Sequence, residues 1–279
     1  MNKILHSFKK SRKAQAGIVM FSFIVFVAVF ADFLAPHDPL AQDLTNRFQP
    51  PVGFGGTWEY PLGTNNLGQD ILSRLMYGAR ISLFIGFVGA LLAAATGIPL
   101  ALIGGYYGGI VDEAIMRVAD IFLSVPAMIL AVAVVGIFDP SPMNVVLVFV
   151  FVSWAWLARA VRSDVLSERE RGYIEAAEVI GCSDKRIIAK HLFPNVMATG
   201  LVLTTLYIAI IILWHAALAF LGLDATELSW GWSLAQGRDH LTNAWWLGTL
   251  PGIAIFVTVI SINLVGDWLR DLFDVRTNT

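Results

Sequence analysis

The chain has 279 residues, of which 57% are hydrophobic and only 14% are charged, and its mean hydropathy is +0.68. Because a soluble domain usually carries about 25% charged residues, much of this surface is expected to face lipid. The net charge of −2 indicates no nucleic-acid partner, the single Cys182 excludes a disulfide within the chain, and the five scattered histidines predict no metal site.

Long stretches with few or no charged residues are the main feature of the chain. A helix needs about 20 residues to cross a bilayer core of about 30 Å. Six stretches meet this length and predict an all-α membrane protein with six transmembrane helices, near residues 17–35, 81–105, 117–137, 143–161, 197–221 and 247–268. The first follows a basic N-terminus, residues 1–16. It is interpreted as a retained span rather than a signal peptide, because Pro36 stands where cleavage would fall.

Lysine and arginine are distributed unevenly between the loops. The segments 1–16, 105–117, 159–195 and 269–279 hold 15 of the 19 basic residues, and the remaining segments hold 4. Since cytoplasmic loops of membrane proteins are enriched in Lys and Arg, this asymmetry predicts that both termini and Cys182 lie on the cytoplasmic side.

Two segments are expected outside the membrane on the opposite side. The loop 36–80 is rich in Pro and Gly. Its end predicts an interfacial helix that lies on the membrane, with an apolar face formed by Ile71, Leu72, Leu75 and Met76. The segment 222–246 holds four tryptophans, interpreted as a belt at the membrane–water boundary, with contact to a soluble partner as the alternative: Trp230, Trp232, Trp245 and Trp246.

A charged stretch, YIEAAEVIGCSDKRIIAKHLFPN, occupies residues 173–195 between the fourth and fifth spans. Gly181 is predicted to end a first short helix with a positive φ, and Ser183 to cap a second one. Pro194 is predicted to end the segment. The sequence therefore predicts two short helices with a sharp bend between them.

The residues of this helix pair indicate docking rather than catalysis. The first helix has an apolar face formed by Ile174, Ala177 and Ile180, and the small Ala176 and Ala177 would let another backbone approach closely. No nucleophile–base pair is present, so no catalytic residue is predicted. From the pattern alone, an amphipathic loop that rests on lipid headgroups is an equal alternative.

The same stretch resembles the signature of permease subunits of bacterial ATP-binding-cassette importers, EAA–x3–G–x9–I–x–L–P. His191 and Phe193 depart from the Ile and Leu of the general form. The matching residues are Glu175, Ala176, Ala177, Gly181 and Pro194.

The resemblance extends over nearly the whole chain and narrows to the dipeptide/oligopeptide/nickel permease family, in its second-subunit branch. It is carried by six motifs in order: YPLGTNNLGQDILSRLMYGARISL, GGYYGGIVDEAIMRVADIFLSVPAMILA, WLARAVRSDVLSERERGYIEAAEVIG, KHLFPN, FLGLDATELSWG and WWLGTLPGIAIFVTVISINLVGDWLRD.

The resemblance implies the permease fold of type I ABC importers in the bacterial cytoplasmic (inner) membrane. A five-helix permease core, residues 81–269, would contain a cytoplasmic coupling loop at 162–195, and residues 270–279 would form a cytoplasmic tail. The implied partners are a second homologous permease subunit, two ATP-binding-cassette ATPase subunits and an external solute-binding protein. ATP and Mg would be bound by the ATPases, because this chain has no GxxxxGK[ST] pattern and is expected to be a non-catalytic subunit without a cofactor.

Ionisable residues inside the spans are functional candidates. Asp120 follows Arg117 by three residues, which predicts an ion pair on one helical face. His215 lies in the middle of the fifth span, where relatives usually carry an acidic residue. It is interpreted as lining the pathway, with a hydrogen bond to a neighbouring helix as the alternative.

The expected cargo is a peptide or a similar small solute, and nickel remains an alternative within the same family. Alternatives of another class are a self-sufficient secondary transporter and a membrane scaffold. The first is not supported by matching half-chain repeats with broken helices, and the second would need no coupling element.

Overall fold

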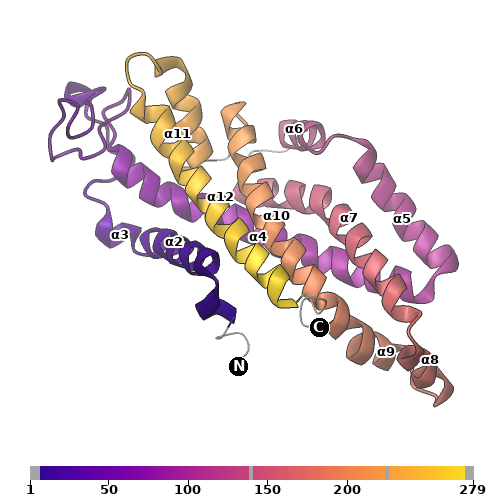
Figure 1. Cartoon of the computed structure of the whole chain (residues 1–279). Helices are drawn as coiled ribbons and strands as arrows, with labels where there is room; N and C mark the ends of the chain where they lie inside the picture. Colours follow the sequence, from indigo (N-terminus) through magenta and orange to yellow (C-terminus); the bar gives the residue numbers. More distant parts are fainter. Residues whose placement is uncertain (1–6, 138–140, 224–225, 274–279) are drawn as a thin grey trace.

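The computed structural model describes residues 7–137, 141–223 and 226–273, and its regular elements there are helices (Figure 1). The long helices are α2 (Arg12–Val29), α4 (Ile71–Tyr107), α5 (Gly109–Ser124), α6 (Ala127–Ile137), α7 (Pro142–Arg169), α10 (Phe193–Phe220) and α12 (Trp246–Phe273). The shorter ones are α3 (Ala31–Leu34), η1 (Leu44–Asn46), α8 (Gly172–Val179), α9 (Asp184–Ile187), the π-helical turn η2 (Ile188–Leu192), α11 (Trp230–Gly237) and η3 (Arg238–His240).

The number of spans equals the six that the sequence predicts if the bent pair α5 and α6 counts as one span. Five helices within the described residues are long and apolar enough to cross a membrane. The sixth candidate is the pair α5 and α6, which is bent by 84°. The bend follows from Pro126, since a residue before proline is disfavoured in helical geometry, and Val125 is extended with φ −102° and ψ 132°. The prediction of one continuous span over residues 117–137 is therefore wrong.

The second span begins earlier than predicted and includes the proposed interfacial helix. Residues 71–107 form one helix, and Asp70 caps its start by accepting a hydrogen bond from Ser73 N at 2.8 Å. Arg80 lies inside this helix because its guanidinium pairs with Asp32 at 2.8 Å and so remains neutralised. The separate interfacial helix is a wrong prediction, since no residue between 71 and 81 breaks the helix.

The fifth span also continues further than predicted. Residues 184–220 form one 37-residue helical segment through the turn η2. Pro194 lies in the first turn of α10, directly after the wider π turn in which Phe193 N bonds to Ile188 O, and this turn accommodates the backbone donor that proline lacks. The sequence predicted that Pro194 ends the segment. This prediction is wrong, because Pro194 lies inside a continuous helix.

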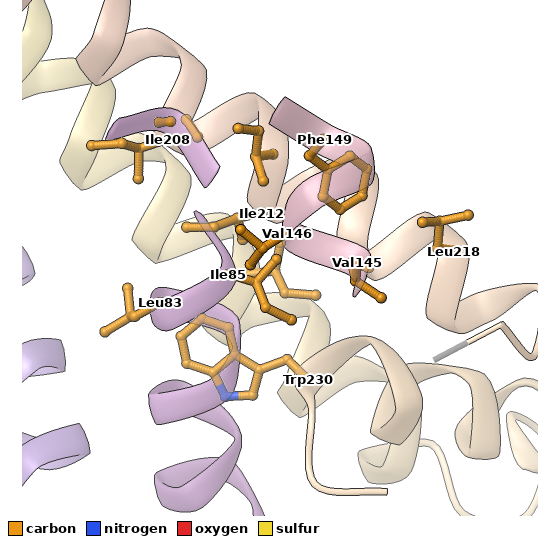
Figure 2. Close-up of a cluster of buried hydrophobic side chains, with 14 of the residues drawn as sticks. Leu83, Ile85, Val145, Val146, Phe149, Ile208, Ile212, Leu218 and Trp230 are labelled. Carbon is orange, nitrogen blue, oxygen red and sulfur yellow. The ribbon is translucent and has the colours of Figure 1, made fainter. Parts of the chain in front are cut away.

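Two apolar clusters hold the helices together. Figure 2 shows the first, in which Trp230 lies beside Ile85 of α4, Val146 of α7 and Ile212 of α10. The second lies nearer the α8 end of the molecule and joins α4 and α7 to α9 and α10. Glycines permit this close packing: a Cβ at Gly97 would lie 2.7 Å from the carbonyl oxygen of Trp154 on α7.

A buried arginine joins the parts of the outer loop. Arg74 is 1% exposed, and its guanidinium donates to Gln69 Oε1 at 2.7 Å, to Pro39 O at 3.2 Å and to Glu227 O. One side chain thus connects the loop 36–70, the start of α4 and the segment that leads into α11.

The tryptophan belt predicted for residues 222–246 is only partly formed. Trp230 and Trp246 are 3% and 5% exposed, and their indole nitrogens donate to Leu75 O at 2.9 Å and Thr64 O at 3.1 Å. These two residues fasten α11 and α12 to α4 and to the outer loop. A boundary role is open only to Trp232 and Trp245, which are more exposed.

Three ion pairs join neighbouring turns or helices at the α5–α7 boundary. Asp120 pairs with Arg159 of α7, and Arg117 pairs with Glu113 one turn earlier at 2.8 Å. The predicted pair between Arg117 and Asp120 is therefore wrong, because each has a partner at better distance. A third pair, Arg162 with Asp112, also connects α7 to α5.

The loops gather at two opposite ends of the molecule. In Figure 1 the loop 36–70 and α11 lie at one end and α8 and α9 at the other. The chain's first described residues meet the end of α12, since Phe8 packs on Trp268 with ring centroids 5.8 Å apart and Trp268 Nε1 donates to Ser7 at 3.2 Å. Of the predicted tail, residues 270–273 belong to α12, and 274–279 lie outside the described residues, as do 1–6 of the N-terminus.

Candidate functional site

The segment between α7 and α10 bends at Gly181, as the sequence predicts, but only its first helix, α8, is short, because α9 continues through η2 into α10. Gly181 has φ +80°. Its N–H donates to Glu178 O at 2.9 Å, and the N–H of Cys182 donates to Ala177 O at 3.0 Å. This pair of bonds is a Schellman motif, which satisfies the last carbonyls of α8 and requires a left-handed residue at the position of Gly181. The predicted bend and positive φ are confirmed.

Buried side chains fix the segment to the rest of the chain. Ile174 and Ala177 of α8 are 1% and 5% exposed, and Ile187 and Leu192 are fully buried. All four belong to the cluster formed with α4 and α7. Ala177 therefore packs on its own subunit, and its predicted contact with an ATPase stays a prediction.

The opposite face of α8 is exposed and partly apolar. Glu175 and Ala176 are exposed, and Val179 and Ile180 are 81% and 79% exposed. No atom lies within 4 Å of a Cβ added to Gly181. Ile180 does not share the apolar face that the sequence predicts for Ile174, Ala177 and Ile180, because α8 ends at Val179 and the chain turns there. We name the exposed residues 175, 176 and 178–181 the docking tip.

A polar network closes the base of the segment. The hydroxyl of Tyr173 donates to Glu168 Oε2 of α7 at 2.8 Å and accepts from Asn195 Nδ2 of α10 at 3.0 Å. Burial, followed by the bond to Glu168, raises the pKa of Tyr173, so the hydroxyl remains a donor at neutral pH. Tyr173 thereby holds the two ends of the segment together.

A second polar contact joins the segment to α4. The hydroxyl of Tyr106 donates to Asp184 Oδ1 at 3.1 Å. Sequence analysis missed this contact because the partners are 78 residues apart. The available signal was the pair of tyrosines between glycines in GGYYGG, residues 104–109.

His215 lies in α10 and is 1% exposed. Two grooves beside α10 are lined by Leu213 and Ala216 and by Trp214, and His215 belongs to neither lining. This burial favours the alternative in which His215 is hydrogen-bonded among neighbouring helices, and its role in the pathway stays a prediction.

We expect His215→Leu to lower the amount of folded subunit, because a buried imidazole that is replaced by an apolar side chain leaves its polar surroundings unsatisfied. His215→Gln, which keeps donor and acceptor atoms, should be milder. The measurement is membrane-inserted yield and thermal stability in detergent, beside transport per folded complex. A normal yield with strongly reduced transport would instead assign His215 to the pathway.

In the part of the chain that the structure describes, no three His, Cys, Asp or Glu side chains gather as a metal site requires. Glu175, Ala176 and Gly181 are brought together on the docking tip, whereas Pro194 lies apart from it in the α10 helix and is exposed. The geometry is that of a rigid projection suited to contact with another protein.

Comparison with known proteins agrees with this arrangement. Residues 97–279 match the family described as binding-protein-dependent transport system inner membrane component, and residues 1–51 match the N-terminal TM domain of oligopeptide transport permease C. The dipeptide transport system permease protein DppC of Haemophilus influenzae is 39% identical over 96% of this chain and 92% of that protein. DppC of Escherichia coli K12 is 40% identical over 99% and 93%.

The di/tripeptide transport system permease protein DppC of Pseudomonas aeruginosa is 39% identical over 99% of this chain and 92% of that protein. Among solved structures, a chain of the MetNI methionine ABC transporter in an inward-facing conformation superimposes with a TM-score of 0.61, at 21% identity, over 72% of this chain and 97% of that chain. The fold is therefore that of a type I ABC importer permease. The chain belongs to the binding-protein-dependent transport system inner membrane component family, as a permease subunit of an ABC importer.

Proposed function

We propose that this subunit forms half of a translocation pathway for dipeptides or similar short peptides, and that the docking tip couples the pathway to ATPase subunits. The observation that carries the coupling role is the tip itself. Val179 and Ile180 are apolar and exposed on one side of a segment whose other side is fixed in the core. Large exposed apolar residues on a rigid projection are typical of a protein contact site.

The peptide cargo is supported by the relatives, several of which are named as dipeptide or di/tripeptide permeases and align over nearly their full length. Nickel or another small solute is the competing cargo. The test is uptake by vesicles that contain the complete importer and its binding protein. Uptake of a labelled dipeptide that requires ATP and is unaffected by excess Ni²⁺ would support the proposal. Uptake of nickel but not of the dipeptide would overturn the proposed peptide cargo. Uptake without ATP would favour a secondary transporter.

We propose a complex with a second homologous permease, two ATPase subunits and an external binding protein. A groove of about 680 Å³ between α10, α11 and α12 is lined almost wholly by apolar side chains, among them Leu213, Phe220, Ile255 and Phe256. Leu213 and Phe256 are 45% and 63% exposed in the single chain. Such a groove supports packing against a second membrane subunit. If the tagged chain were purified from membranes and no ATPase came with it, this assembly would be contradicted and a scaffold would be favoured.

The proposed orientation places the docking tip in the cytoplasm. Cys182, the single cysteine, is partly exposed next to the tip. We expect that only membrane-permeant thiol reagents label it in intact cells. As a control, Ala41→Cys in a Cys182→Ser background puts a thiol at an exposed position of the outer loop and should react with impermeant reagents. Rapid labelling of Cys182 by an impermeant reagent would contradict the orientation.

A further inference from the structure

Tyr106 lies in the last turn of α4, beside the segment that carries the docking tip. Its ring is 7% exposed and belongs to the apolar cluster of α4, α7, α9 and α10. Its hydroxyl reaches Asp184 Oδ1 at 3.1 Å, at the first residue of α9. Tyr106 thus joins α4 to α9, two helices whose contacting residues are 78 positions apart in the sequence.

The segment between α7 and α10, which we call the coupling segment, is not adjacent to α4 along the chain, because α5, α6 and α7 lie between them. The segment continues from α7 and leads into α10, and its passage to α10 runs through the π-helical turn η2. A movement of the docking tip therefore reaches α7 and α10 along the backbone. It reaches α4 through side-chain contacts, among which the bond between Tyr106 and Asp184 is polar and directional.

The helix α4 is suited to carry such a movement across the molecule. It has 37 residues, which corresponds to a length of about 55 Å at 1.5 Å per residue. Its inner part is closely packed on α7, where a Cβ at Gly105 would lie 2.6 Å from Val165 Cγ1. Its outer end holds Arg74, which joins the outer loop and the segment before α11.

We propose that Tyr106 is a positioning residue that ties the coupling segment to α4 through Asp184, so that α4 moves with the docking tip and carries that movement to the outer face. This inference rests on the proposed coupling function. It assigns the transmission of movement, and not the docking itself, to Tyr106.

The test compares single-residue variants in the complete importer. Tyr106→Phe keeps the buried ring and removes only the hydroxyl, and Asp184→Ala removes the acceptor. Each is expected to leave ATPase co-purification unchanged and to lower the cargo imported per ATP hydrolysed by about threefold or more. Asp184→Asn keeps an acceptor oxygen and should restore most of this ratio.

The neighbouring tyrosine supplies the matched control. Tyr107 is 50% exposed and packs edge-on against Tyr106 at 5.2 Å, so Tyr107→Phe should behave like the parent. The double variant Tyr106→Phe/Asp184→Ala should be no worse than either single variant, because both remove the same bond.

Three results would overturn the proposal: a parent-like ratio for Tyr106→Phe, effects that multiply in the double variant, or loss of ATPase co-purification in Tyr106→Phe. Failure of the proposed function is distinguishable, because the parent itself would then neither retain an ATPase nor import cargo with ATP.

Discussion

Gly181→Val is expected to stop transport while the subunit still reaches the membrane. Gly181 has φ +80° within the Schellman motif that ends α8. A residue with a Cβ in this conformation faces a backbone cost on the order of 1–2 kcal/mol, and a β-branched residue lies at the upper end. No atom lies within 4 Å of a Cβ added at Gly181, so the space beside this residue is open to a side chain. The strain and the added side chain both act on the docking tip, which we expect to lose at least about tenfold in ATPase affinity.

The measurement is ATPase co-purification and cargo uptake beside two matched variants. Gly181→Asn should be tolerated better, since Asn adopts left-handed geometry more readily than Val. Gly172→Val adds the same side chain at another exposed glycine of the segment, also with open space around it but without a left-handed φ, and should be mild. Glu175→Gln keeps shape and should also be mild. Normal transport by Gly181→Val, or a more damaging Glu175→Gln, would show that the shape of the tip is not what the partner recognises.

Local signals predicted much of this molecule. Apolar stretches of span length located the long helices, and the sequence GCS predicted the bend at Gly181, because a glycine directly after a helix is a strong local preference. The errors concern helix ends that tertiary contacts decide. The sequence predicted a separate amphipathic helix over residues 71–80, because Arg80 separates them from the apolar stretch 81–105. In the fold Asp32 neutralises that charge, and the helix continues.

The docking tip could be predicted as a segment, but not residue by residue. The helical periodicity of Ile174, Ala177 and Ile180 predicted one apolar face. That inference failed at Ile180, since the helix ends at Val179 and periodicity no longer applies beyond it. The contact between Tyr106 and Asp184 depends on how α4 and α9 meet in space, which no local pattern contains.

Arg74→Met is expected to detach the outer loop and to lower the stability of the whole subunit. The guanidinium is 1% exposed and donates to Gln69 Oε1 and to the carbonyls of Pro39 and Glu227. Methionine has similar length but no donor, so the carbonyls of Pro39 and Glu227 would lose these bonds, and Gln69 Oε1 would keep only its bond from Asn65 Nδ2. A hydrogen bond to a charged group contributes about 1.5–3 kcal/mol, and an unmatched buried group adds its desolvation cost. We therefore expect a loss on the order of 3–5 kcal/mol, since several bonds disappear together.

The consequence reaches function because Arg74 connects the outer loop to α4 and to the segment that leads into α11. Arg74→Met should expose residues 36–70 to added protease, lower the thermal midpoint in detergent and reduce transport more than tenfold. Arg74→Lys should recover only part, because an ammonium cannot present the flat fork that reaches three acceptors from one position. Arg47→Met is the matched control, since Arg47 is exposed on the same loop and should change stability by less than about 0.5 kcal/mol. An Arg74→Met subunit with the parent's thermal midpoint and a protease-resistant outer loop would show that other contacts, such as those of Trp230 and Trp246, hold this face together without the arginine.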